Sequence, residues 1–302
     1  MRVRANGVEL EVEIHGPAAG EPLLLVMGLG MQLVGWHEGL VEQFVAAGFR
    51  VIRFDNRDIG LSQGFDELGT PSLVLAAARQ VLGLPLVPPY TLEDMADDAA
   101  GLLDALGIAS AHVCGASMGG MIAQLLALRH PRKVRSLTLV MTSSGSRRLP
   151  RPSLKVQRAM LARPERPADM DSLLEHYRRL YTLIGSPAYR PEPAAFEARL
   201  RASLGRAYRP RGTARQMMAI LAAPDRTPVL PAIRQPTLVV HGAADPLVPP
   251  AAGEDLARRI AGARLDLVEG MGHDLPAPLW PRLVSGVSAN AFCLADTRAM
   301  ST

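Results

Sequence analysis

The sequence predicts an α/β fold with a mostly parallel central sheet, helices on both faces and an inserted helical cap. Short apolar runs typical of buried strands alternate along the chain with segments of helical period, which favours a parallel sheet covered on both faces. The alternation stops after residue 143 and resumes near residue 233. This interruption predicts a core domain of residues 1–143 and 233–302, with residues 144–232 inserted as a helical cap or lid.

The first half of the chain supplies the start of the sheet. Residues 8–15 alternate with period two and predict an edge hairpin strand. Residues 22–28 form a continuous apolar run, which is typical of a strand buried on both faces. An excursion at 62–90 carries an apolar helix that we expect to flank the site. The elements expected between and after these are a helix over 36–47, a strand over 49–55, a helix over 92–107, a strand over 111–117, a helix over 118–130 and a strand over 134–142.

The middle of the chain, from 144 to 232, is rich in proline and arginine and shows no clear buried strand. It has helical stretches at 172–184 and 194–204. The alternation then returns with an expected strand over 236–245, a helix over 251–261, a strand over 263–270 and a last helix over 278–290.

Composition and length define the class of protein. The 302 residues are 48% hydrophobic and 21% charged, which are ordinary globular values and exclude a disordered chain or a coiled coil. Cys114 and Cys293 are the only cysteines, and they have neither metal-ligand spacing nor a disulfide framework. The first residues lack the continuous apolar core and the cleavage site expected of a signal peptide, and no apolar run is long enough to predict a membrane span. We therefore expect a cytoplasmic protein, a monomer or a homodimer, with no integral membrane span.

The positive charge is concentrated in the middle of the chain. The formal net charge is +4, yet the segment from Arg147 to Arg215 holds 16 basic and 6 acidic residues, a surplus of +10. One interpretation is a solvated arginine-rich helical insertion. The other is a surface for anionic lipid, an acidic substrate or a partner subunit. No nucleic-acid-binding motif accompanies the charge, so nucleic acid is not an expected partner.

The peptide Gly115-Ala116-Ser117-Met118-Gly119 matches the pattern G-x-S-x-G between a buried strand and a helix. A sharp turn in that context projects the serine hydroxyl above the carboxyl end of the sheet, and the helix N-terminus behind it favours developing negative charge. Ser117 is therefore the expected nucleophile. The alternative is a tight packing turn with an idle serine.

A serine nucleophile needs a base and a group that orients the base. His273 follows the last predicted strand and is the expected base, although a loop histidine that caps the next helix is the alternative. Asp245 ends the preceding strand at the same edge of the sheet and is the expected orienting acid. Its alternative is a turn before Pro246. Asp274 is adjacent to His273 in sequence, and neighbouring side chains rarely form the hydrogen bond that orients an imidazole. Asp255 is expected on a helix face.

Two backbone N–H groups are needed to hold a developing oxyanion. One is expected from Met118, which follows the nucleophile. The other is expected from Leu29, because Gly28 and Gly30 give the loop after the 22–28 strand a tight path. The alternative is a glycine-rich loop that serves only packing. A phosphate-binding loop is excluded because the ending Lys-Ser/Thr is missing.

These motifs carry a family resemblance. The chain resembles serine carboxylesterases of the α/β-hydrolase fold, in particular the bacterial aclacinomycin methylesterase-like hydrolases, from about residue 8 to 285. The resemblance implies the catalytic residues Ser117, Asp245 and His273, an oxyanion hole from Leu29 and Met118, and a helical cap. The stretches that carry it are LLLVMGLGMQLVGW, RVIRFDNRDIGLS, GASMGGMIAQ, TLVVHGAADPLVP and GMGHDLP.

One position departs from the family pattern. Many relatives carry His-Gly in the oxyanion loop, where this chain has Met27-Gly28. The donors are backbone groups, so we expect function to survive. Asp55, Arg57 and Asp58 lie in a motif loop that we expect to hold the architecture.

The expected activity is hydrolysis of small to medium or apolar carboxylic esters through an acyl-enzyme, without metal or organic cofactor. Thioesterase, lipase, lactonase, carbon–carbon hydrolase and perhydrolase chemistry use the same residues, and fold alone does not choose among them. Haloalkane dehalogenase and epoxide hydrolase activities are not expected, because the common enzymes of these classes resemble this fold but carry aspartate where Ser117 stands. A non-catalytic ligand-binding protein of this fold is a further alternative.

Overall fold

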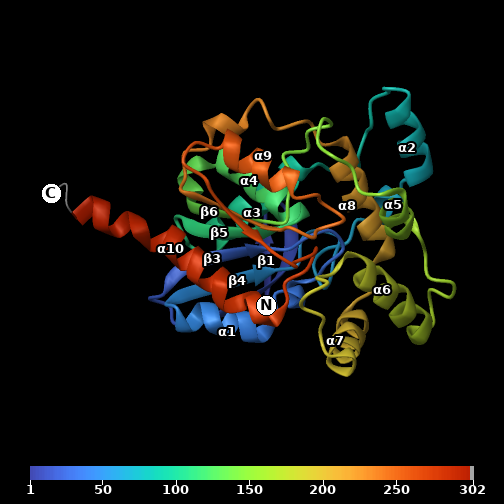
Figure 1. The fold of residues 1–302 in the computed structure, drawn as a ribbon, viewed down its shortest axis with the longest axis horizontal. Coiled ribbons are helices and arrows are strands. Elements are labelled where there is room, and N and C mark those ends of the chain that lie inside the picture. Colours follow the sequence, from blue (N-terminus) through green and yellow to red (C-terminus); the bar gives the residue numbers. More distant parts are fainter. Residues whose placement is uncertain (300–302) are drawn as a thin grey trace.

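The computed structural model describes residues 1–299, except for the side chains of Val81 and residues 293–299 (Figure 1). Its centre is an eight-stranded sheet of order β1-β2-β4-β3-β5-β6-β7-β8, which confirms the predicted α/β class. The first two pairings are antiparallel and the other five are parallel. The strands are β1 (Arg2–Ala5), β2 (Val8–His15), β3 (Glu21–Val26), β4 (Phe49–Phe54), β5 (Ala111–Ala116), β6 (Val134–Val140), β7 (Thr237–Gly242) and β8 (Arg264–Val268).

The prediction that residues 8–15 form the edge strand is wrong. β1 forms that edge, and β2 lies between β1 and β4. Asn6 and Gly7 join the two strands with φ angles of 50° and 78°, the left-handed geometry of a two-residue hairpin. The Asn-Gly pair was the signal for this hairpin in the sequence.

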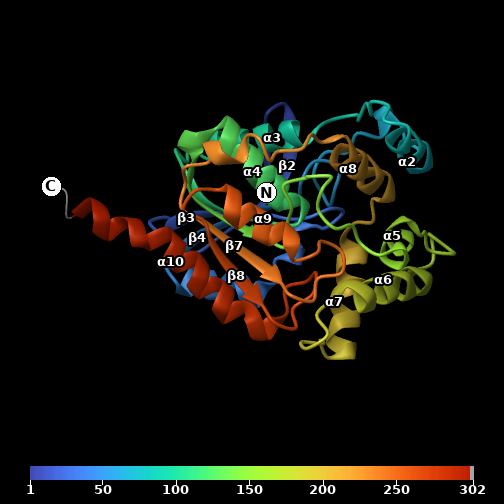
Figure 2. The ribbon, with the colours of Figure 1, turned by 45° about the horizontal axis from the view of Figure 1, so that its top comes forward.

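Helices cover both faces of the sheet (Figures 1 and 2). Along β3, Leu24 and Val26 join the hydrophobic cluster of one face, whereas Leu23 and Leu25 join that of the other. Burial on both sides is the reason that this strand is apolar at every central position. The helices of the first face are α3 (Leu92–Ala105), α4 (Met118–Arg129) and α9 (Ala251–Arg259), and those of the second are α1 (Glu38–Ala46) and α10 (Trp280–Ala299). α10 continues well past the predicted end at residue 290, and Cys293, which it contains, lies outside the described side chains.

Four helices lie between β6 and β7, where the sequence predicts an insertion, and we call them the inserted helices. Two of them match predicted segments, and α5 and α8 are additional. They stand beyond the end of the sheet opposite the C-terminus, with α2 (Leu73–Val81) packed against α8 (Figure 2). The inserted helices are α5 (Leu154–Leu161), α6 (Met170–Ile184), α7 (Pro193–Arg206) and α8 (Pro210–Ala222). No helix within residues 1–299 has the length and apolar character to cross a bilayer.

One buried histidine gives the fold a testable pH dependence. His112 on β5 is 2% exposed, its Nδ1 lies 2.7 Å from Ser136 Oγ, and burial lowers its pKa from 6.5 to about 4. Below pH 6.5 the unfolded chain therefore takes up this proton before the folded chain does, and stability is lost as the pH falls. We expect His112 to remove about 2 kcal/mol of unfolding free energy between pH 7 and pH 5.

Urea unfolding of wild type and His112→Asn at the two pH values tests this expectation. The variant should lose about 2 kcal/mol less than wild type over that interval, whatever its stability at pH 7. Equal losses in the two proteins would show that His112 is not the responsible group.

Candidate active site

Ser117 occupies a strained turn between β5 and α4. Its φ and ψ angles are 54° and −119°, a conformation that costs a non-glycine residue about 1–3 kcal/mol. The flanking glycines make the turn possible. A Cβ on Gly115 would stand 2.3 Å from the carbonyl oxygen of Gly119, and one on Gly119 would stand 2.0 Å from that of Val26. The turn thus brings the serine hydroxyl to the carboxyl edge of the sheet.

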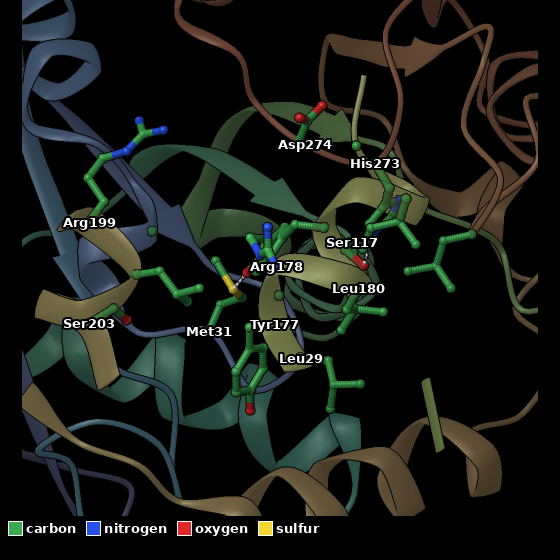
Figure 3. A pocket seen from close by; sticks show the side chains of 18 of the residues that line it. Leu29, Met31, Ser117, Tyr177, Arg178, Leu180, Arg199, Ser203, His273 and Asp274 are labelled. Carbon is green, nitrogen blue, oxygen red and sulfur yellow. Dashed lines mark hydrogen bonds between the residues drawn. The ribbon is translucent and has the colours of Figure 1, made fainter. Parts of the chain in front are cut away.

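The structure brings the three predicted side chains into one hydrogen-bonded row. His273 Nε2 lies 3.0 Å from Ser117 Oγ (Figure 3). His273 Nδ1 lies 2.7 Å from Asp245 Oδ2. His273 and Asp245 are 8% and 4% exposed, so the row is largely shielded from water. Low local dielectric strengthens such hydrogen bonds.

Asp245 uses its two oxygens differently. Oδ1 accepts the N–H groups of Leu247 and Val248 at 2.9 and 2.8 Å, which is the turn considered as its alternative role. Oδ2 is left for His273. His241, which is fully buried and has its pKa lowered chiefly by burial, instead makes a 2.8 Å contact through Nε2 with the Val248 carbonyl. The turn therefore fixes the carboxylate while leaving one oxygen toward the imidazole.

The loop after β3 lies directly against the serine. A Cβ on Gly28 would stand 3.2 Å from Ser117 Cβ. Leu29 lines the cavity with Ser117, and Met118 begins α4. Among the described residues, neither the Leu29 nor the Met118 N–H has a hydrogen-bond acceptor. Leu29, in the loop against Ser117, and Met118, next to Ser117 in the chain, thus each carry an unpartnered backbone donor.

The inserted helices hold this loop in place. Gln216 of α8 is fully buried, and its Oε1 accepts the Gly30 N–H at 2.9 Å while its Nε2 donates to the Arg57 carbonyl at 2.9 Å. Gln32 Nε2 donates to the carbonyl of Ala207 at 2.8 Å. No feature of the sequence singled out Gln216, because its partners are distant in the chain.

The motif loop at residues 55–58 has the architectural contacts expected of it. Asp55 Oδ1 accepts the Leu33 N–H at 2.7 Å, and its Oδ2 accepts Arg206 of α7 at 2.7 Å. Asp58 accepts two guanidinium donors of Arg215 of α8, both at 2.7 Å. These buried carboxylates therefore join the core to the inserted helices.

The loop of His273 has a similar support. The His273 N–H donates to the carbonyl of Ile184, the last residue of α6, at 2.7 Å. Ser186 receives the Gly272 N–H on its hydroxyl at 2.9 Å, and it donates its own N–H to Asp274 Oδ1 at 3.1 Å. Asp274 thus faces Ser186 and not the imidazole.

A cavity of about 2220 Å³ opens over Ser117 and His273 (Figure 3). Its wall is mainly apolar and aromatic, with Tyr181 donating its hydroxyl to Met31 Sδ at 2.8 Å. Burial raises the pKa of Tyr181 to about 12, so it stays protonated at neutral pH. The inserted helices contribute Tyr177, Leu180, Tyr181, Phe196 and Met217, the connection between α7 and α8 contributes Tyr208, and the core contributes Met31, Met121 and Met141.

Comparison with known proteins agrees with this architecture. Residues 21–276 match the family model of the alpha/beta hydrolase fold, and the chain belongs to that family. Within it, the chain is 30% identical to rhodomycin D methylesterase DnrP of Streptomyces peucetius, over 94% of this chain and 95% of the relative. It is 29% identical to rhodomycin D methylesterase DauP of Streptomyces sp. (strain C5), over 95% and 96%. The predicted resemblance to methylesterases is thereby confirmed.

A solved structure is similar over a comparable length. The enol-lactonase from Burkholderia xenovorans LB400 is 28% identical, with a TM-score of 0.72 that covers 96% of this chain and 99% of the enzyme. Relatives that are named as acting on linear and on cyclic esters therefore share this fold.

Proposed function

We propose that the protein is a serine hydrolase that cleaves carboxylic esters, methyl esters among them, through an acyl-enzyme. The observation that carries the proposal is the hydrogen-bonded row Ser117–His273–Asp245 beside two unpartnered backbone donors. The methylesterase relatives, which match almost the whole chain, support the choice of ester substrate. We assign Ser117 as nucleophile, His273 as base and Asp245 as the group that orients it.

The geometry allows the same groups to serve both the formation and the hydrolysis of the acyl-enzyme. Ser117 Oγ attacks the ester carbon while His273 Nε2 takes the hydroxyl proton. The N–H groups of Leu29 and Met118 hold the carbonyl oxygen as it gains charge. His273 then gives its proton to the leaving alcohol, and Ser117 keeps the acyl group. A water that His273 deprotonates attacks the acyl-enzyme, and His273 returns the proton to Ser117 Oγ as the acid is released.

We also propose that residues 144–232 act as a cap over a core of residues 1–143 and 233–302. The side chains that the inserted helices turn toward the cavity would then select the substrate. The wall is rich in aromatic and methionine side chains, which suits an apolar acyl group. A lactone is the second candidate substrate, favoured by the similarity to the enol-lactonase.

A p-nitrophenyl ester series from acetate to palmitate, together with methyl esters and lactones of matched size, tests this assignment. Wild type should hydrolyse at least one ester class in a reaction that Ser117→Ala abolishes. Methanol release would identify methyl ester cleavage, and a ring-opened hydroxy acid would identify lactone cleavage. Serine-independent turnover of every substrate would contradict the proposal.

The contact between Gln216 and Gly30 gives a further prediction. Gln216→Ala should lower kcat about tenfold to hundredfold and leave KM nearly unchanged, because the Leu29 N–H loses its fixed position. A boronic acid that mimics the tetrahedral intermediate should bind more weakly by the same factor. Gln235→Ala, which removes an amide that binds the distant Pro131 carbonyl, is the matched control. A variant with higher KM and unchanged kcat would show that Gln216 serves substrate binding instead.

A further inference from the structure

An exposed apolar surface surrounds the end of the molecule that carries α2. Within the segment 73–87, five large apolar side chains are between 46% and 82% exposed, while Ala76 is buried. Exposed apolar surface of this extent, on α2 and on the segment that follows it, indicates a contact surface. The five side chains, which we call the apolar rim, are Val74, Leu75, Leu82, Leu84 and Val87.

A row of basic residues belongs to the neighbouring segment 147–164. All six of its basic side chains are exposed, and none forms a salt bridge with any residue that the structure describes. Neither this segment nor residues 70–92 contains an acidic residue. Two exposed leucines, Leu154 and Leu161, stand among these cations. The basic side chains are Arg147, Arg148, Arg151, Lys155, Arg158 and Arg163.

Both segments contribute residues to the wall of the cavity. α2 and α5 lie at the same end of the molecule in both views (Figures 1 and 2). The cavity over Ser117 is lined by Leu73 of α2 and by Met160 and Leu161 of α5. The helices that carry part of the apolar rim and part of the basic group therefore also contribute to the cavity wall, and Arg163 is the basic residue of this group that lines it.

We propose that this surface docks the protein on an anionic lipid bilayer. The apolar rim would enter the boundary between headgroups and acyl chains, and the basic side chains would contact anionic headgroups. Charge complementarity favours a membrane over a second copy of the chain, because a symmetric dimer would place the same unpaired cations on both sides of the contact. An apolar ester dissolved in the bilayer would then enter the cavity without crossing water.

Vesicle sedimentation with the full chain tests the proposal. Vesicles of equimolar phosphatidylglycerol and phosphatidylcholine should bind the protein at low salt. Vesicles of pure phosphatidylcholine should bind it with an affinity at least about tenfold lower. Added salt should weaken the binding. The triple variant Val74→Ser/Leu75→Ser/Val87→Ser and the triple variant Arg147→Glu/Arg148→Glu/Lys155→Glu should each lose about tenfold in affinity for the mixed vesicles.

Two controls and an inactive variant separate this proposal from others. Leu265→Ser on β8 and Arg132→Glu after α4 change exposed residues elsewhere and should bind as wild type does. Ser117→Ala should also bind unchanged, so failure of the proposed catalysis leaves this test intact. Both triple variants should keep hydrolysing soluble p-nitrophenyl acetate at the wild-type rate if they are folded.

The proposal is overturned if wild type ignores anionic vesicles, or if both triple variants bind them as wild type does. It is also overturned if sedimentation equilibrium shows a dimer that the Val74/Leu75/Val87 variant dissociates, without any binding of vesicles. A dimer of this kind would identify the apolar rim as an interface between copies of the chain.

Discussion

Replacing Ser117 by alanine is expected to lower kcat on the best ester by on the order of 10⁶-fold while KM changes little. The substitution removes the proposed nucleophile, whose Oγ lies 3.0 Å from the imidazole nitrogen that is proposed to take its proton. The backbone donors and the cavity are left in place. Residual turnover should therefore resemble that of water attack in an intact pocket.

The measurement is steady-state hydrolysis, paired with mass spectrometry after treatment with diethyl p-nitrophenyl phosphate. Wild type should gain one phosphoryl adduct, and Ser117→Ala should gain none. Ser110→Ala, at the amino end of the same strand, is the matched control and should behave as wild type does. Retention of a few per cent of activity by folded Ser117→Ala would show that another group is the nucleophile.

The second large effect is expected from Asp245→Asn, with a fall in kcat of about 10⁴-fold. An asparagine keeps the oxygen that accepts the Leu247 and Val248 N–H groups, so the turn survives. Its amide nitrogen replaces the oxygen that faces His273 Nδ1. The imidazole must then present a protonated Nε2 to Ser117, and it is unable to accept the serine proton.

Kinetics of Asp245→Asn beside Asp274→Asn distinguish this effect from loss of charge near the site. Asp274 is next to His273 in sequence, but its Oδ1 accepts the Ser186 N–H at 3.1 Å. Its asparagine variant keeps that acceptor and should retain most of the wild-type kcat. Equal losses in the two variants would contradict the orienting role of Asp245.

The sheet and the candidate site were predictable because their signals are local. Gly115 and Gly119 stand beside Ser117 in the chain, so the turn is visible as a pentapeptide. The carboxyl ends of parallel strands meet at one edge of a sheet, and that rule alone brings Asp245 and His273 toward Ser117. The structure places His273 within hydrogen-bonding distance of both Ser117 and Asp245.

The groups that hold the loops of the site in place were not predictable, because their partners are distant in the sequence. Gln216 lies 186 residues from Gly30, and a buried glutamine in an amphipathic helix gives no sign of its partner. The Ile184 carbonyl, which holds the His273 N–H, is a backbone group that no residue type reports. β1 is a different case, because the Asn6-Gly7 turn that separates it from β2 was a local signal that the strand assignment did not use.

The inserted helices are tied to the reacting groups by their own backbone and by buried side chains. Ile184 anchors the loop of the base, Gln216 anchors the loop of Leu29, and Arg215 binds the buried Asp58. An insertion grafted from a distant relative would arrive without these ties and would displace the very atoms that it is meant to serve. Exchanges of single cavity-facing side chains such as Tyr177 would therefore alter the cavity with less disturbance of these ties than replacement of the whole insertion.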